Sequence, residues 1–272
     1  MRAVAVLPVV FFHAGLPLFD GGYVGVDIFF VISGFLITGI ILKDQEKGQF
    51  SVLRFYERRA RRILPALLLV IGVCIPVAVW LMVPFQLREF SQSIVAALFF
   101  FSNFYFWHRS NYFAPDAEQM PLLHTWSLSI EEQFYVVFPL LLILILKYRK
   151  NAVLPLFIGM GLLSLLAAEY GWRVHPEANF FFPTARAWEL LAGAVCAVVL
   201  KNYRIETSSL LSFLGIVLIL IAVFAFGSET PHPSLLTSLP VVGTILVILF
   251  ANRENGVGQF LSLSLFRRIG LI

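Results

Sequence analysis

A histidine and an arginine occupy one face of the first apolar segment. Arg2 and His13 are eleven residues apart. At about 100° per residue this offset is near three helical turns, so both side chains project from one side of a helix, roughly 16 Å apart along its axis. A neutral imidazole that accepts a proton near neutral pH is what general base catalysis requires. A packing histidine bonded to a backbone carbonyl fits the spacing equally well.

A single aspartate follows, early in the second apolar segment. Asp27 lies two residues after Gly25, and Gly34 follows about two helical turns later. The glycines permit close approach between helix backbones. Asp27 either orients the imidazole of His13 or is an acid at a helix start near the membrane interface, and the sequence leaves both interpretations open.

Four arginines fill five positions at the start of the third apolar segment: Arg58, Arg59, Arg61 and Arg62. Side chains three or four residues apart share a helix face. Guanidinium groups bind phosphates through paired hydrogen bonds, and they also anchor helices to anionic lipid head groups. We expect some members of the cluster to contact a phosphate-rich cytoplasmic donor and others to contact lipid.

Two further charged groups stand near the starts of later apolar segments. The polar stretch 124–132 precedes an apolar segment. Acids are favoured at the start of a helix, which explains Glu131 better than Glu132. Arg186 and Glu189 are three residues apart, and we interpret them as a mutually neutralising pair. Three further histidines stand in predicted loops with no pattern that indicates a metal site: His108, His175 and His232.

The composition indicates that a lipid bilayer is the solvent of this chain. Of 272 residues, 59% are hydrophobic and 13% are charged, with a mean hydropathy of +0.86, whereas about a quarter of the residues of a soluble domain are charged. A bilayer core takes about 20 helical residues per crossing. The sequence predicts an all-α polytopic transmembrane bundle with about nine spans, at 3–19, 23–42, 63–83, 93–107, 133–147, 153–170, 185–200, 209–226 and 235–251.

Basic residues predict the orientation of these spans. The loop 43–62 carries seven lysines and arginines and is therefore expected in the cytoplasm, together with the N-terminus. Arg2 is then at the cytoplasmic edge, and His13 points into the bundle near mid-membrane. Strict alternation of nine spans would put the basic residues at 147–150 and 201–204 outside, which the same rule disfavours. Either one segment, 93–107 above all, does not cross, or the first loop overrides the later ones.

Five blocks of this sequence, in order, resemble the acyltransferase 3 family of bacterial membrane O-acyltransferases. They are the basic-x10-His pair Arg2/His13, GGYVGVDIFFVISGFLIT at 21–38, FYERRARRILP at 55–65, HTWSL with EEQFY at 124–135, and RAWELLAG at 186–193. The family acetylates O-antigen, capsular and other surface glycans, including those of lipopolysaccharide. The blocks cover almost the whole chain, and their combination is much more specific than any one block.

The resemblance implies an enzyme that transfers an acyl group, usually acetyl, from cytoplasmic acetyl-CoA to a hydroxyl of a cell-surface glycan. It implies a multi-pass protein of the bacterial inner (cytoplasmic) membrane. Its partners would be acyl-CoA as the donor substrate, a surface polysaccharide or lipid-linked glycan as acceptor, and membrane lipid. No bound cofactor, metal or nucleic acid is expected.

The resemblance also implies roles for individual residues. His13 is the expected catalytic histidine, which deprotonates the acceptor hydroxyl or relays the acyl group, and Arg2 is its motif partner. Asp27 or Glu132 is expected to orient the imidazole. The expected contacts to the phosphates of the donor are Arg58, Arg61 and Arg62.

The ends of the chain differ from the family pattern. Met1 directly precedes Arg2, and the sequence stops at Ile272, where relatives continue into a further span and many add an extracytoplasmic hydrolase-like domain. We therefore expect a single membrane domain over 1–272, incomplete at its C-terminal end. A transporter or flippase for an acyl or glycan carrier, and an inactive truncated relative, are the alternatives; the sequence lacks the paired broken helices in two related halves that favour a transporter.

Overall fold

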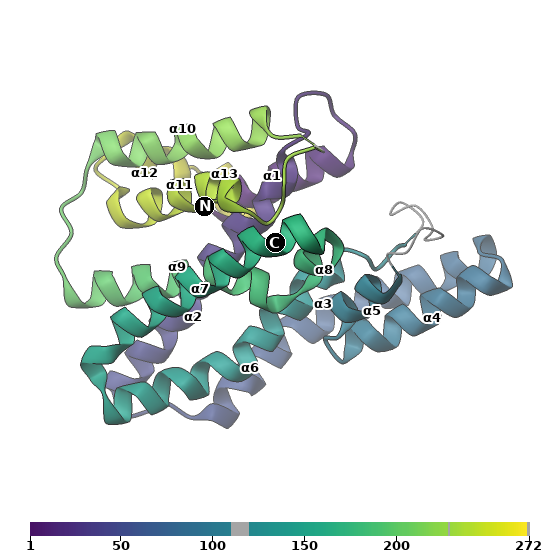
Figure 1. The fold of residues 1–272 in the computed structure, drawn as a ribbon, viewed down its shortest axis with the longest axis horizontal. Coiled ribbons are helices and arrows are strands. Elements are labelled where there is room, and N and C mark those ends of the chain that lie inside the picture. The colour runs from purple at the N-terminus through teal and green to yellow at the C-terminus, as the bar shows by residue number, and fades with distance from the viewer. Residues whose placement is uncertain (110–119, 228, 271–272) are drawn as a thin grey trace. The chain divides into compact units, whose positions relative to one another are not determined.

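A computed structural model describes residues 1–109, 120–227 and 229–270 of the chain (Figure 1). All regular structure in these ranges is helical, as predicted. The α-helices are α1 (Arg2–His13), α2 (Gly25–Glu46), α3 (Val52–Leu81), α4 (Pro84–Leu98), α5 (Ser102–Arg109), α6 (Thr125–Tyr148), α7 (Val153–Val174), α8 (Pro176–Phe181), α9 (Pro183–Asn202), α10 (Ser209–Ala225), α11 (Ser238–Phe250), α12 (Gly256–Leu261) and α13 (Ser264–Ile269). Short 3-10 helices are η1 (Gly22–Val24), η3 (Lys150–Ala152) and η4 (Leu235–Thr237).

Five helical segments of the described chain are long and apolar enough to cross a membrane: Gly22–Glu46, Val52–Leu81, Thr125–Tyr148, Lys150–Val174 and Pro176–Asn202. Three shorter apolar helices match other predicted spans: Arg2–His13, Ser209–Ala225 and Leu235–Phe250. The helical membrane bundle is therefore confirmed in kind. The predicted number of nine spans is not.

The predicted span at 93–107 is wrong as a single helix. The chain breaks between α4 and α5, where Phe100 has a φ of 56°. The 15 residues of α4 and the 8 of α5 extend about 22 and 12 Å, less than the roughly 30 Å of a bilayer core. This break favours the alternative that the run does not cross.

The chain divides into two compact units. Unit 1 comprises Met1–Ile40, Leu142–Phe180 and Thr184–Ile272, and unit 2 comprises Ile41–Leu141 and Phe181–Pro183.

In unit 1, glycines let α2 and α9 pack with their backbones in contact. A Cβ on Gly34 would lie 1.8 Å from the carbonyl oxygen of Leu190, and one on Gly193 would lie 1.9 Å from that of Val31. The two helices run in the same direction, because Asp27 near the start of α2 also contacts Arg186 near the start of α9. Small residues are the usual means by which membrane helices approach this closely.

The turn between α1 and α2 is fixed in the same way. A Cβ on Gly22 would lie 2.2 Å from the carbonyl oxygen of Pro8, and one on Gly25 would lie 2.2 Å from that of Ala5. The segment 21–25 therefore lies directly on α1, with no room for side chains at these glycines. Gly21 makes a similar approach to α10, where its Cβ would lie 2.3 Å from the carbonyl oxygen of Ala222.

In unit 2, α4 and α5 form a helical hairpin and lie side by side (Figure 1). Arg109, the last residue of α5, pairs with Glu89 near the start of α4 at 2.9 Å, so the chain returns toward the end from which it entered. Near the tip, the hydroxyl of Ser102 on α5 lies 2.7 Å from that of Ser129 on α6. Such hydrogen bonds between helices hold the hairpin against α6.

Candidate functional site

His13 is the last residue of α1, and its side chain is not covered by other described residues. Its Nδ1 lies 2.8 Å from the carbonyl oxygen of Val9. A carbonyl only accepts hydrogen bonds, so in the neutral ring Nδ1 carries the proton and Nε2 has a free lone pair. One of the two interpretations drawn from the sequence, a histidine bonded to a backbone carbonyl, is therefore observed. It does not exclude a general base, since the bond leaves Nε2 ready to take a proton.

Arg2 and His13 lie on one helix, as their spacing predicted, but α1 ends at His13 and does not continue to residue 19 as the predicted span 3–19 required. The expectation that His13 points into the helix bundle is wrong within the described residues, because its side chain is exposed. The physical reason is that α1 ends at His13 and a turn begins there, so no further helical turn covers the ring.

A sealed cluster of charged groups lies inside unit 1. Nη1 of Arg186 on α9 donates to Oδ1 of Asp27 on α2 at 2.8 Å, and both side chains are 0% exposed. The same nitrogen lies 3.4 Å from Oε1 of Glu189, which is also fully buried. His232, from the loop between α10 and η4, places Nε2 3.0 Å from Oδ2 of Asp27. We call these four residues the buried cluster.

Both ring nitrogens of His232 are occupied. Nδ1 faces Nη2 of Arg186 at 3.1 Å, and a guanidinium only donates, so Nδ1 accepts. Nε2 then carries the proton and donates to Asp27. Burial, and next the positive charge of Arg186, lower the pKa of His232, although Asp27 opposes the shift. The ring is neutral at neutral pH and has no free lone pair, so it is not a general base.

The carboxylate that the sequence paired with His13 thus serves another histidine. Asp27 orients the ring of His232 and neutralises Arg186. The predicted Arg186–Glu189 pair exists, but the shorter bond of Arg186 is to Asp27. The sequence missed His232, which is 205 residues from Asp27; only contact across the fold identifies it.

Unit 2 holds a second cluster of similar composition, which we call the open cluster. Nη2 of Arg59 on α3 donates to Oε1 of Glu132 on α6 at 2.7 Å and lies 3.8 Å from Oε1 of Glu131. The guanidinium stacks over the ring of Tyr135 at 4.0 Å, and the Tyr135 hydroxyl donates to Glu131. Arg59 and Glu132 remain 15% and 13% exposed.

A cavity of about 470 Å³ adjoins the open cluster. Its polar end is formed by Arg59, Glu132 and Gln133. Its apolar lining includes the hairpin tip 99–101 and Val136 and Val137 of α6. This volume lies in the range of small-molecule sites, which are mostly apolar with a few polar groups.

The other three arginines of the block lie on exposed parts of α3. Arg58 pairs with Asp44 at 2.9 Å and Arg61 with Glu57 at 2.8 Å, while their side chains remain 51% and 79% exposed. Arg62 is exposed as well. Such surface pairs exchange readily with a ligand phosphate. Arg59 was not among the predicted donor contacts, and only its contact with Glu132 on α6 distinguishes it from its neighbours.

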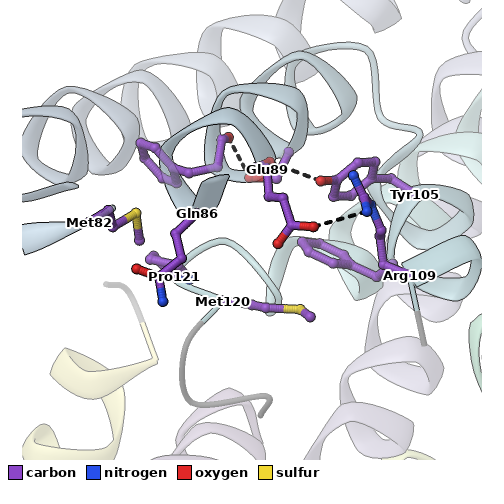
Figure 2. Close-up of a pocket in the computed structure, with 10 residues that line it drawn as sticks. Met82, Gln86, Glu89, Tyr105, Arg109, Met120 and Pro121 are labelled. Atoms are coloured by element: carbon purple, nitrogen blue, oxygen red, sulfur yellow. Dashed lines mark hydrogen bonds and ion pairs between the residues drawn. The ribbon is translucent and has the colours of Figure 1, made fainter. Parts of the chain in front are cut away.

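A further cavity lies at the open end of the α4–α5 hairpin (Figure 2). The Glu89–Arg109 ion pair borders it, and Tyr105 donates to the backbone oxygen of Glu89 at 2.9 Å. The cavity measures about 30 Å³, which is room for about two water molecules. It is too small for a substrate, and its polar groups hold the hairpin closed.

The chain belongs to the acyltransferase 3 family. The family model described as an acyltransferase domain matches residues 1–272. The chain is therefore assigned to the acyltransferases, as its five sequence blocks predicted. No solved structure matches it.

Named relatives share this family. The peptidoglycan O-acetyltransferase OatA of Listeria monocytogenes is 34% identical over 288 residues, covering 99% of this chain and 46% of the relative. A putative O-acetyltransferase of Staphylococcus aureus strain COL is 32% identical, covering 85% of this chain and 40% of the relative. An uncharacterised protein of Haemophilus influenzae is 32% identical, covering 84% of this chain and 99% of the relative. The chain thus spans less than half the length of the two relatives named as O-acetyltransferases.

Proposed function

We propose that this chain is a multi-pass O-acetyltransferase of the bacterial inner (cytoplasmic) membrane that moves an acetyl group from cytoplasmic acetyl-CoA to a hydroxyl of a cell-envelope glycan. The observation that carries the proposal is the state of His13 in a chain of an acyltransferase family. Its ring is exposed, and the bond from Nδ1 to Val9 leaves Nε2 as an acceptor.

His13 acts as the general base. Nε2 takes the proton of the acceptor hydroxyl while its oxygen attacks the acyl carbonyl, so an acyl C–O bond forms as the bond to the donor group breaks. The proton then passes to the leaving group. Fixing the second ring nitrogen by a hydrogen bond keeps the imidazole in the tautomer that this step needs. Arg2, at the other end of α1, does not touch the reacting atoms in this scheme.

The helix lengths support an orientation that satisfies the charge rule. If the α4–α5 hairpin does not cross, α6 runs toward the cytoplasm, and α7 and α9 follow in alternation. The basic groups after α6 and α9 then lie on the same side as the loop 43–62, as the positive-inside rule favours; they are Lys147, Arg149, Lys150, Lys201 and Arg204.

The same orientation puts the parts of unit 1 that carry His13 and the buried cluster on the extracytoplasmic side. These are the end of α1 with His13, the starts of α2 and α9, and the loop that carries His232. An envelope glycan reaches His13 from that side.

The donor is expected on the cytoplasmic side, at the start of α3. Arg58, Arg61 and Arg62 bind its phosphates, since their side chains are exposed and hold only surface ion pairs. The cavity beside Arg59 begins on the same helix. It provides an apolar space for the arm that joins those phosphates to the acyl group. Glu132 is paired with Arg59, and we assign it to this donor region rather than to orienting an imidazole.

The acceptor is a glycan hydroxyl. The OatA relative is named for peptidoglycan, and the family resemblance points to O-antigen in lipopolysaccharide. Both polymers carry the same reacting group, so the site chemistry is common to them.

Membrane vesicles that contain the protein, supplied with acetyl-labelled acetyl-CoA and either peptidoglycan strands or O-antigen, test the proposal. We expect covalent label on one of the two glycans. Label that enters the vesicles without becoming covalent would identify a carrier and contradict the enzyme.

The matched variants are His13→Ala and His108→Ala. Loss of Nε2 as base is expected to lower the rate by about 100-fold or more, whereas His108, at the end of α5, leaves the rate unchanged. A His13→Ala protein that inserts normally and still acetylates glycan at the native rate would remove His13 from the mechanism.

A further inference from the structure

We propose that the buried cluster is a positioning site for His13, and that the ring of Tyr23 transmits its hold from the loop 226–234 to α1. This inference rests on the proposed role of His13. It assigns a function to Asp27, Arg186 and His232 that the proposed reaction does not by itself require.

The first step is from the cluster to the loop. His232 is the residue of the loop that enters the cluster, and Asp27 and Arg186 bind both of its ring nitrogens. Nε of Arg186 also donates to the carbonyl oxygen of Phe180 at 3.4 Å, which ties the start of α9 to α8. His232, attached by hydrogen bonds to fully buried charges, has little freedom to move, because each bond lost leaves a charge unpaired away from water.

The second step is from the loop to the turn after α1. The ring of Tyr23 packs edge-on against that of His232, with centroids 4.7 Å apart. Its hydroxyl donates to the carbonyl oxygen of Gly227 at 3.3 Å. Tyr23 thus touches the loop at two points, one through its ring and one through its hydroxyl.

The third step is from the turn to His13. The ring of Tyr23 also contacts that of Phe12, with centroids 5.8 Å apart, and the ring of Phe12 contacts that of His13 at 5.1 Å. The neighbouring Gly22 lies against the backbone of α1 at Pro8. The end of α1 is therefore held between backbone contact at Gly22 and aromatic contact at Tyr23.

This arrangement gives the buried cluster a purpose, although its histidine, His232, has no free lone pair and the cluster is closed to substrate. A base has to be held to within a fraction of an ångström, since a displacement of about 1 Å can lower a rate by about 100-fold. His13 stands at an exposed helix end, where thermal motion is largest. The buried cluster supplies the rigid support that this exposed end lacks.

Tyr23→Leu tests the proposal with Tyr23→Phe as its conservative partner. The leucine removes the ring contacts to Phe12 and His232, whereas phenylalanine keeps them and loses only the hydroxyl bond. We expect kcat to fall by about 10- to 100-fold in Tyr23→Leu, with the KM for acetyl-CoA within twofold of the native value. Tyr23→Phe is expected to restore kcat to within threefold.

Phe180→Leu is the matched control. Phe180 contacts the same cluster from α8, with its ring 5.9 Å from that of His232 and 5.2 Å from the guanidinium of Arg186. We expect its kcat to stay within twofold of the native value. An equal loss in Phe180→Leu and Tyr23→Leu, or a loss that Tyr23→Phe does not restore, would mean that the ring of Tyr23 is not the link between the cluster and α1, and would overturn the proposal.

A distance measurement tests the same proposal without activity. Spin labels at Ala14→Cys and Tyr170→Cys, in a chain carrying Cys74→Ser and Cys196→Ala, report the distance from the end of α1 to α7; both labelled positions are exposed. We expect one narrow distance in the native chain and in Tyr23→Phe, and a distribution broader by several ångströms in Tyr23→Leu.

The two readouts separate the two proposals. If Tyr23→Leu keeps the narrow distance, the positioning role is overturned, whatever the activity of His13→Ala. If His13→Ala is fully active while the distance broadens in Tyr23→Leu, the catalytic role of His13 fails and the cluster positions the end of α1 for another purpose.

Discussion

The buried cluster and the open cluster are built from nearly the same parts. Each places one arginine against two carboxylates and one ring, which is His232 in unit 1 and Tyr135 in unit 2. They differ in access. Arg186 and Asp27 are 0% exposed, whereas Arg59 and Glu132 are 15% and 13% exposed and border a cavity of about 470 Å³.

The difference in access separates support from recognition. A charge sealed inside a bundle can lose its partner only at a large cost, so it fixes the helices that carry it. Each cluster keeps one buried polar atom without a hydrogen-bond partner in the described structure, Nε of Arg59 and Oε2 of Glu189. What distinguishes the open cluster is the cavity that Arg59 and Glu132 line. We therefore assign stability to the first cluster and donor binding to the second.

The largest expected effect is on the stability of the buried cluster. Arg186→Ala leaves Asp27 and Glu189 buried without their cation, which costs about 3–5 kcal/mol. We expect the variant to be lost from the membrane or to unfold at a much lower temperature in detergent. Arg59→Ala is the comparison and is expected to lose less than half as much, because water reaches its partners. Equal losses would show that access does not distinguish the clusters.

The second effect concerns the cavity. Val137→Trp fills the space beside the open cluster and is expected to raise the KM for acetyl-CoA about tenfold, which is about 1.4 kcal/mol of binding, with unchanged thermal stability. Leu140→Trp is the control, since Leu140 is an exposed residue of the same helix that is absent from the cavity lining. An unchanged KM in Val137→Trp, measured by initial rates, would separate the cavity from donor binding.

The sequence predicted the helical class, the family and the position of Arg2 and His13 on one helix because these depend on local pattern. The long apolar runs require helices, and Arg2 and His13 are close enough in sequence for one helix to relate them. It could not predict that Asp27 meets His232, since nothing local distinguishes a loop histidine from one that enters a cluster 205 residues away.

The error at 93–107 has a similar cause. Its apolar composition is that of a span, but the backbone of Phe100 turns into the left-handed region, and three consecutive phenylalanines give no warning of it. By contrast, Gly25 and Gly34 indicated close backbone contact, and the structure confirms it at Ala5 and Leu190.

A smaller effect should distinguish the second carboxylate of each cluster. Glu189→Gln replaces the more distant of the two carboxyl groups that face a single buried guanidinium. Because Asp27 still neutralises Arg186, we expect a change of unfolding free energy within about 1 kcal/mol, in either direction. Glu132→Gln removes the nearer partner of Arg59 and is expected to change the KM for acetyl-CoA more than the melting temperature. A large loss of stability in Glu189→Gln would make it, rather than Asp27, the principal partner of Arg186.

The smallest expected effect is the pH dependence of the buried cluster. The pKa of His232 is lowered in the folded state, by burial first and by Arg186 second. As the pH falls below the ordinary histidine value of about 6.5, the unfolded chain takes up the proton first, so stability is lost in the window between that value and the folded pKa. Asp27, Arg186 and the ring of Tyr23 face the imidazole, and of these only Asp27 favours the proton.

His232→Asn keeps one donor and one acceptor but does not titrate. We expect the melting temperature of the native chain in detergent to fall by about 2–4 °C more than that of the variant between pH 7 and pH 5. Parallel curves would mean that the pKa of His232 is the same in the folded and unfolded states and that the cluster is not sealed from water.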